Sequence, residues 1–213
     1  MEYYRRHLPH FLPSEAIFFV TFRLVNSLPV WIIDKLRNEY DSELALAEYK
    51  KTDPSIKKLP EEFYRRYFLE FDGFLDNQKS NDNWLNDSRV AKVVADAIHF
   101  RANIKYDLIC FCIMPNHVHL VIEILEKHNN AANSTTKYLT KVLQSLKSYT
   151  AIQSNIILQR DGQFWQSENY DRVIRNEKEF EEVINYVAYN PVKAGLVSDV
   201  KDWPFTFCKY TIE

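Results

Sequence analysis

The sequence predicts an α+β fold in which an antiparallel sheet is covered by helices. The first observation is a set of apolar runs, rich in β-branched and aromatic residues, at positions 17–24, 108–114 and 117–125. The second is a set of helical patterns, with apolar residues three or four positions apart, between these runs and after them. Separated strands mixed with helices are typical of an antiparallel sheet that buries one or both faces under helices.

The expected strands are bounded by turn residues. The first runs from Ile17 to Leu24, ahead of a turn at Ser27 and Pro29. The run at 108–114 is followed by Pro115 and Asn116 and then by the run at 117–125, which predicts a hairpin. Near the end of the chain, residues 163–165 are expected to form a short extended segment and residues 170–175 a candidate strand.

Three amphipathic helices are expected around these strands. The first lies within residues 82–102, with Asp87 or Ser88 as its N-cap. The second runs from Thr135 to about residue 158, and the third from about 177 to 190. Proline disfavours α geometry in the residue before it, so Pro191 is expected to end or kink this last helix.

The length of 213 residues, with 46% hydrophobic side chains, fits a single domain over residues 1–213. A charged region with helical stretches, broken by prolines, is expected to form a helical insertion at about 30–82. The formal net charge of -2 excludes a protein that coats nucleic acid by bulk positive charge, although a local patch is compatible with it. With three glycines in the whole chain, no glycine-rich phosphate-binding loop can be built.

The location is expected to be cytoplasmic. The three cysteines, an odd number without a CxxC pair, indicate a reduced protein. The first ten residues are polar and doubly basic, unlike a secretory signal, and no run approaches the ~18 apolar residues that a membrane span needs. No membrane partner is expected.

Two histidines stand out in the third expected strand. Side chains alternate along a strand, so Val118, Leu120 and Ile122 share one face while His117 and His119 share the other. Two imidazoles at this spacing can hold one metal ion or one phosphate. An HxH pair is also found as ordinary exposed or hydrogen-bonded strand residues, so the pair alone does not define a site.

The third expected helix supplies a candidate nucleophile and a candidate ligand. Tyr186 and Asn190 are four residues apart and therefore lie one turn apart on one edge of its apolar stripe. An oxygen ligand such as the Asn190 amide would suit Mg or Mn better than a third soft ligand. An interfacial aromatic and a helix C-terminal residue are common alternative uses, and Tyr189 and Tyr170 are further nucleophiles by residue type.

Four segments together resemble one family. They are Arg5-Arg6-His7-Leu8-Pro9-His10, Val20-Thr21-Phe22-Arg23, Met114-Pro115-Asn116-His117-Val118-His119-Leu120, and Asn185-Tyr186-Val187-Ala188-Tyr189-Asn190-Pro191-Val192-Lys193-Ala194-Gly195-Leu196. In this order they resemble the REP-associated tyrosine transposases of the HUH single-strand transposase superfamily. The similarity extends nearly to the end of the chain, at Trp203-Pro204-Phe205. A further stretch, Trp165 with Glu168 to Arg172, also resembles the family without an assigned role.

The resemblance implies a ferredoxin-like fold and a metal-dependent reaction on single-stranded DNA that contains a hairpin. His117, His119 and Asn190 would hold Mg or Mn, and Tyr186 would nick the strand and carry it as a 5′-phosphotyrosine before strand transfer. Arg5, Arg6, Arg23 and Arg172 are candidate phosphate contacts, although any one of them is as readily an ion-paired surface arginine. Lys193 is a helper for Tyr186 by its position, although a solvated surface lysine is the more common use of such a residue.

Three other functions stay open at this point. The chain could be a non-catalytic module that binds a DNA hairpin, or a metal-dependent hydrolase in which water attacks in place of Tyr186. A zinc oxygenase site would need a further histidine and a carboxylate at barrel spacing, which His99 and His128 do not supply. Both a monomer and a homodimer are compatible with the sequence.

Overall fold

The computed structural model describes residues 2–6, 8–12, 16–49, 59–77, 83–124 and 135–210. It divides the chain into two compact units, Asn26–Asp82 and the remainder, Met1–Val25 with Asn83–Glu213. The smaller unit corresponds closely to the helical insertion expected at about 30–82. The expectation of a single domain over residues 1–213 stays a prediction.

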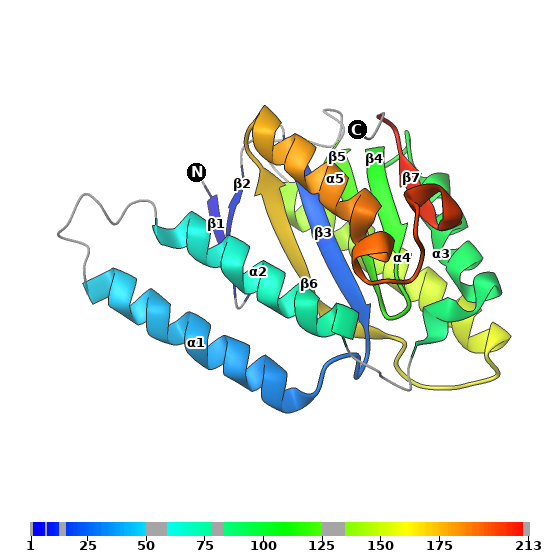
Figure 1. The fold of residues 1–213 in the computed structure, drawn as a ribbon, viewed down its shortest axis with the longest axis horizontal. Coiled ribbons are helices and arrows are strands. Elements are labelled where there is room, and N and C mark those ends of the chain that lie inside the picture. Colours follow the sequence, from blue (N-terminus) through cyan, green and yellow to red (C-terminus); the bar gives the residue numbers. More distant parts are fainter. Residues whose placement is uncertain are drawn as a thin grey trace. The chain divides into compact units, whose positions relative to one another are not determined.

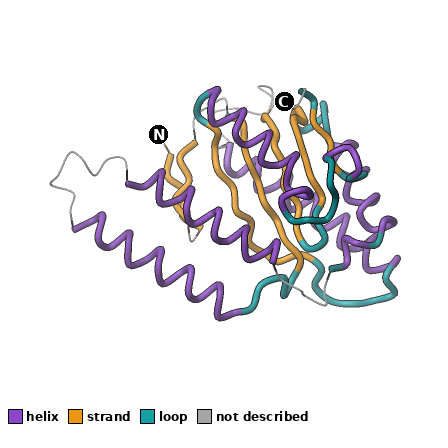
Figure 2. The backbone as a smooth tube through the Cα atoms, in the orientation of Figure 1, coloured by secondary structure: helices purple, strands orange, loops and turns teal. Residues whose placement is uncertain are grey.

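The larger unit is built on a five-stranded antiparallel sheet with strand order β6-β3-β5-β4-β7. Figure 1 labels these strands, and Figure 2 shows them in orange with helices on both sides. The bounds are β3 Ile17–Leu24, β4 Tyr106–Ile113, β5 His117–Ile124, β6 Trp165–Ile174 and β7 Thr206–Cys208. A separate two-stranded sheet pairs β1, Glu2–Arg6, with β2, Leu8–Leu12.

The helices of this unit are α3 (Ser88–Arg101), α4 (Thr135–Ile157) and α5 (Glu177–Lys193). The order β3-α3-β4-β5-α4-β6, with β6 and β4 flanking the β3-β5 centre, is the ferredoxin-like arrangement that the resemblance implies. The predicted α+β class is therefore confirmed. Short 3-10 turns at Trp84–Asn86 and Val200–Asp202 complete the described elements.

Two faces of the sheet have different partners. The even-numbered residues of β3 and β5, among them Val20 and Leu120, pack with buried residues of α3 and α4 in one core cluster. On the opposite face, α5 lies over β4, β5 and β7. Because side chains alternate along β5, the odd-numbered His117 and His119 share the face opposite Leu120, as predicted, and this is the face on the α5 side.

Several predicted boundaries are accurate. β3 spans the predicted residues, and Asp87 caps α3 by accepting a hydrogen bond from the backbone N–H of Arg89 at 2.9 Å. The predicted hairpin turn is closed by a hydrogen bond from Met114 N to His117 O at 2.9 Å. Within the described residues, no helix is both long enough and apolar enough to cross a bilayer.

Pro191 was predicted to end or kink the last helix, and the predicted end at residue 190 is wrong, because α5 continues to Lys193. Ala194 caps the helix, and the next residue, Gly195, has a φ of 70°, the left-handed conformation that glycine adopts readily. Leu196 N bonds to Pro191 O and Gly195 N to Val192 O, both at 2.9 Å, which is a Schellman ending. A proline in the last turn lacks an N–H but still supplies a carbonyl, and here that carbonyl closes the helix.

The smaller unit contains two helices: α1, Val30–Tyr49, is followed by α2, Leu59–Asn77. Leu28, Ile32 and Leu36 form a buried cluster with Leu75 of α2. An ion pair between Lys35 Nζ and Glu70 Oε1 at 3.0 Å also joins the two helices. This unit therefore has a small apolar core of its own.

Replacing Leu120 with alanine should lower the free energy of unfolding by about 3 kcal/mol. Leu120 is fully buried on the central strand, so truncation leaves a cavity against α3 and α4. Urea denaturation of wild type and variant measures the change. Ile156→Ala is the matched control, because Ile156 is 66% exposed on α4 and should change stability by less than about 0.5 kcal/mol. Equal losses in both variants would contradict this assignment of the core.

Candidate metal centre and nucleophile

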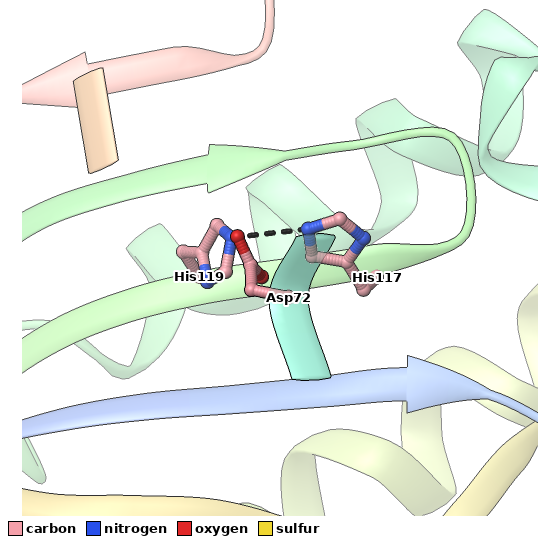
Figure 3. A group of neighbouring side chains, drawn as sticks. All are labelled: Asp72, His117 and His119. Atoms are coloured by element: carbon pink, nitrogen blue, oxygen red, sulfur yellow. Dashed lines mark hydrogen bonds between the residues drawn. The ribbon is translucent and has the colours of Figure 1, made fainter. Parts of the chain in front are cut away.

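The two histidines of β5 face each other directly. His117 Nε2 and His119 Nε2 are 3.0 Å apart, and the ring planes are inclined at 73°. Figure 3 shows the two imidazoles side by side on the strand. Asp72, which is also drawn there, belongs to the other unit, Asn26–Asp82.

The Nδ1 atom of each imidazole is hydrogen-bonded to a side-chain oxygen. His117 Nδ1 lies 2.6 Å from Asn116 Oδ1, and His119 Nδ1 lies 2.8 Å from Thr21 Oγ1. An amide oxygen only accepts, so the bond to Asn116 places a proton on His117 Nδ1 and leaves Nε2 with a lone pair. The hydroxyl of Thr21 can accept in the same way from His119. Oxygen partners behind the ring nitrogens are typical of histidines that bind metals.

This arrangement fits a cation between the two Nε2 atoms. Two lone pairs aimed at each other at 3.0 Å repel unless a cation or a shared proton lies between them. The two facing nitrogen atoms are therefore candidate ligands for one cation.

Thr21 and Asn116 were quoted in the sequence motifs but were not predicted as partners of the histidines. Asn116 immediately precedes His117, so its proximity was visible in the sequence. Thr21 is directly opposite His119 in the β3-β5 register, a pairing between positions 98 residues apart. No local pattern in either strand specifies that register, so this contact could not be predicted from the sequence.

Replacing Thr21 with valine should weaken Mn²⁺ binding by about 10- to 100-fold, because His119 loses the oxygen that orients its ring. Isothermal titration with Mn²⁺ measures the dissociation constant. Thr206→Val is the matched control: its hydroxyl contacts Cys112 Sγ at 3.3 Å and is not part of the histidine pair. Unchanged affinity in the Thr21 variant would show that the hydroxyl does not support a metal ligand.

Tyr186 of α5 lies against this histidine pair. Its ring centroid is 5.7 Å from that of His119 and 6.3 Å from that of Phe19, both in edge-to-face geometry. The Nζ atom of Lys193, two turns further along α5, lies 5.1 Å from the centre of the Tyr186 ring. Tyr186 is half-buried, so it combines contact with the histidine face and access from solvent.

Asn190 follows one turn after Tyr186 and is fully buried in α5. Asn190 was predicted at one edge of the apolar stripe of this helix. In the structure its side chain lies on the buried face of α5. Tyr189 is 43% exposed, and Tyr170 is buried on β6 opposite Thr21. Of the three candidate tyrosines, Tyr186 is the one whose ring contacts a histidine among the described ring contacts.

The four arginines predicted to contact phosphate differ in their structural surroundings. Arg23 is buried and directly opposite His117 in the β3-β5 register, so it shares the histidine face of the sheet. Arg172 Nη2 forms an ion pair with Glu179 Oε1 at 2.9 Å. Arg5 and Arg6 belong to β1, and their side chains lie outside the described part of the structure.

Glu179 links β6 to the start of α5. Besides Arg172, its carboxylate accepts a hydrogen bond from the backbone N–H of Arg175 at 2.9 Å. The side chain of Asn176 caps the helix by accepting from Glu179 N at 2.9 Å. The contact between Arg172 and Glu179 therefore ties the previously unassigned stretch Trp165–Arg172 to α5.

The fold and the site define a ferredoxin-like domain with a histidine pair on its central strand and a tyrosine on the helix above it. Among curated proteins, the chain is similar to a putative REP-associated tyrosine transposase of Haemophilus influenzae, with 31% identity over 102 residues. That match covers 47% of this chain and 58% of the relative, so it spans little more than half of the relative's length. No family model matches the chain.

Two further comparisons extend the similarity. The REP-associated tyrosine transposase of Escherichia coli K12 is 22% identical over 145 residues, which cover 67% of this chain and 80% of that protein. A solved structure of a REP-associated tyrosine transposase bound to a REP hairpin shares the fold, with a TM-score of 0.50 and 15% identity. It covers 97% of this chain and 82% of that one. The chain is thus similar to the REP-associated tyrosine transposases, the family that its motifs resemble.

Proposed function

We propose that this chain nicks single-stranded DNA next to a hairpin and transfers the cut strand through a covalent 5′-phosphotyrosine on Tyr186. The contact of the Tyr186 ring with His119, whose Nε2 faces that of His117, is the observation that carries the proposal. The named relatives support a transposase, and the DNA hairpin in the solved relative supports the substrate class.

The proposed ligands of a divalent cation are His117, His119 and Asn190. We favour Mg or Mn because the proposed ligand set includes an amide oxygen, which suits these cations better than a third soft ligand would. Such a cation, when bound, would polarise the scissile phosphate and neutralise charge on its non-bridging oxygens. Asn116 and Thr21 would keep both Nε2 atoms directed at this position.

The remaining chemistry belongs to the protein. The Tyr186 oxygen attacks phosphorus, a new O–P bond forms, and the bond from phosphorus to the 3′ oxygen of the preceding nucleotide breaks. The tyrosine proton is lost and the departing 3′ oxygen gains one, which leaves a free 3′-hydroxyl. A second 3′-hydroxyl then attacks the phosphotyrosine and restores the phenol, so strand exchange needs no nucleotide fuel.

Two basic side chains are placed to assist. The Lys193 ammonium lies over the Tyr186 ring and would stabilise negative charge near the reacting oxygen and phosphate. Arg23, beside the histidine pair in the register, would contact a phosphate at the cut position. Arg5, Arg6 and Arg172 are proposed for the flanking DNA backbone, and for Arg172 this requires exchange of its bond with Glu179. A cytoplasmic location suits this substrate.

The test is an adduct assay with the purified chain. Labelled single-stranded DNA hairpins from around the gene are incubated with Mn²⁺, with Mg²⁺ or with EDTA, and the products are separated on a denaturing gel. A protein-DNA adduct that requires the cation supports the proposal. Cleavage without an adduct would replace it with a hydrolase, and hairpin binding with neither would replace it with the binding module.

A further inference from the structure

Cys110 and Cys208 are opposite each other in neighbouring antiparallel strands. They are Cα partners in the β4-β7 pairing. Backbone bonds run from Lys209 N to Ile109 O and from Ile113 N to Phe205 O, at 2.8 and 3.0 Å. Hydrogen-bonded and non-hydrogen-bonded pairs alternate along such strands, so the pair at 110 and 208 is non-hydrogen-bonded.

A pair of this kind has the geometry of a disulfide. Opposite Cα atoms at non-hydrogen-bonded positions are about 4.5 Å apart, with side chains on the same face. That separation is within the range of about 4.4 to 6.8 Å found between disulfide-bonded cysteines. The register thus permits a bond between the two sulfur atoms without movement of either strand.

The two thiols already interact. Cys110 is fully buried and Cys208 is partly exposed, and each thiol shifts the pKa of the other. The hydrogen bond from the Cys110 thiol lowers the pKa of Cys208 to about 7. The same bond, together with burial, raises the pKa of Cys110. Cys208 is therefore the thiolate and Cys110 the proton-bearing partner near neutral pH.

The third cysteine has other partners although it is on the same strand. Cys112 is fully buried, and its sulfur contacts Met114 Sδ at 3.7 Å and the Thr206 hydroxyl at 3.3 Å. Its direct partner in β7 is Thr206. The position of Cys112 two residues from Cys110 makes it an internal comparison for reactivity in the same strand.

We propose that Cys110 and Cys208 form a peroxide-responsive thiol pair that closes to an intramolecular disulfide between β4 and β7. The Cys208 thiolate attacks the peroxide O–O bond, which gives a Cys208 sulfenic acid and releases hydroxide. The Cys110 sulfur then displaces the sulfenic oxygen, and its proton leaves in water. In total, two thiols and one hydrogen peroxide give one disulfide and two waters.

The bond would secure an edge strand. β7 has three residues, lies at the end of the sheet and contacts α5, the helix that carries Tyr186. In the reduced protein an ion pair between Lys209 Nζ and Asp107 Oδ2, at 2.7 Å, ties the end of β7 to β4. The proposal is independent of the DNA reaction, since it depends on the register of these two strands alone.

The test oxidises the full-length chain with hydrogen peroxide, alkylates the remaining thiols under denaturing conditions, and maps tryptic peptides by mass spectrometry. Cys110 and Cys112 share one tryptic peptide, because the neighbouring cleavage sites are Lys105 and Lys127. The assay is therefore run on wild type, Cys112→Ser, Cys110→Ser and Cys208→Ser. A linked peptide that disappears on dithiothreitol treatment is expected in wild type and in Cys112→Ser.

Loss of the linked peptide in both Cys110→Ser and Cys208→Ser completes the expected result. The rate of iodoacetamide reaction at Cys208 in the reduced chain should rise with a midpoint near pH 7. A disulfide between two chains through Cys208, a sulfinic acid at Cys208 with Cys110 still reduced, or a link that needs Cys112 would overturn the proposal. Absence of any oxidation at Cys208 would overturn it as well.

Discussion

Replacing Tyr186 with phenylalanine should abolish the covalent protein-DNA adduct, with a fall in strand transfer of about a thousandfold or more. Phenylalanine keeps the ring that contacts His119 and Phe19 and removes the oxygen that would bond to phosphorus. Packing of α5 and binding of the DNA hairpin should therefore be preserved. The amount of adduct on a denaturing gel, beside the affinity for the hairpin, separates these two effects.

Tyr189→Phe is the matched control for this experiment, since Tyr189 is on the same helix and 43% exposed. It should form adduct at the wild-type rate. An adduct that persists in Tyr186→Phe and disappears in Tyr189→Phe would move the nucleophile to Tyr189. Loss of hairpin binding together with the adduct would indicate that the hydroxyl of Tyr186 serves structure or recognition and not attack.

Replacing His119 with alanine should remove measurable Mn²⁺ binding and lower DNA cleavage by roughly 100- to 1000-fold. The change deletes one of two nitrogen atoms that face each other at 3.0 Å and leaves the Thr21 hydroxyl without its ring partner. The electron paramagnetic resonance signal of free Mn²⁺ reports binding directly, without reference to activity. Circular dichroism establishes that the variant is folded.

His99→Ala is the comparison for this histidine. His99 packs against Phe111 and Phe207 at centroid distances of 5.3 and 5.0 Å, on α3 and away from the β5 pair. Its loss should leave Mn²⁺ binding unchanged. Equal Mn²⁺ affinity in wild type and His119→Ala would remove the histidine pair from the proposed metal centre.

The part of this fold that depends on local pattern was predictable from the sequence. Alternation along β5 separated the histidines from the apolar face, and the capping residue Asp87 marked the start of α3. β6 was harder to predict, because polar residues within Trp165–Ile174 interrupt the apolar alternation that identifies a strand. Its ten residues were therefore predicted as two short segments.

The parts that depend on pairing between distant strands were not predictable. β7 has three residues, too few to show a periodicity, and its register with β4 places Cys208 opposite Cys110. The contact between Thr21 and His119 likewise depends on the β3-β5 register. The predicted helix ending was wrong because the bias against α geometry before a proline is a preference only: Asn190 stays helical, and the Pro191 carbonyl accepts the closing bond from Leu196.

The most direct test of the central claim is to locate the covalent bond to DNA. The adduct formed with Mn²⁺ is digested with nuclease and trypsin, and the modified peptide is sequenced by fragmentation in a mass spectrometer. Tyr186 and Tyr189 fall in one tryptic peptide that ends at Lys193, so the fragment ions between them assign the site. The account predicts a nucleotide on Tyr186. A nucleotide on Tyr189 or Tyr170, or cleaved DNA with no modified peptide, would contradict it.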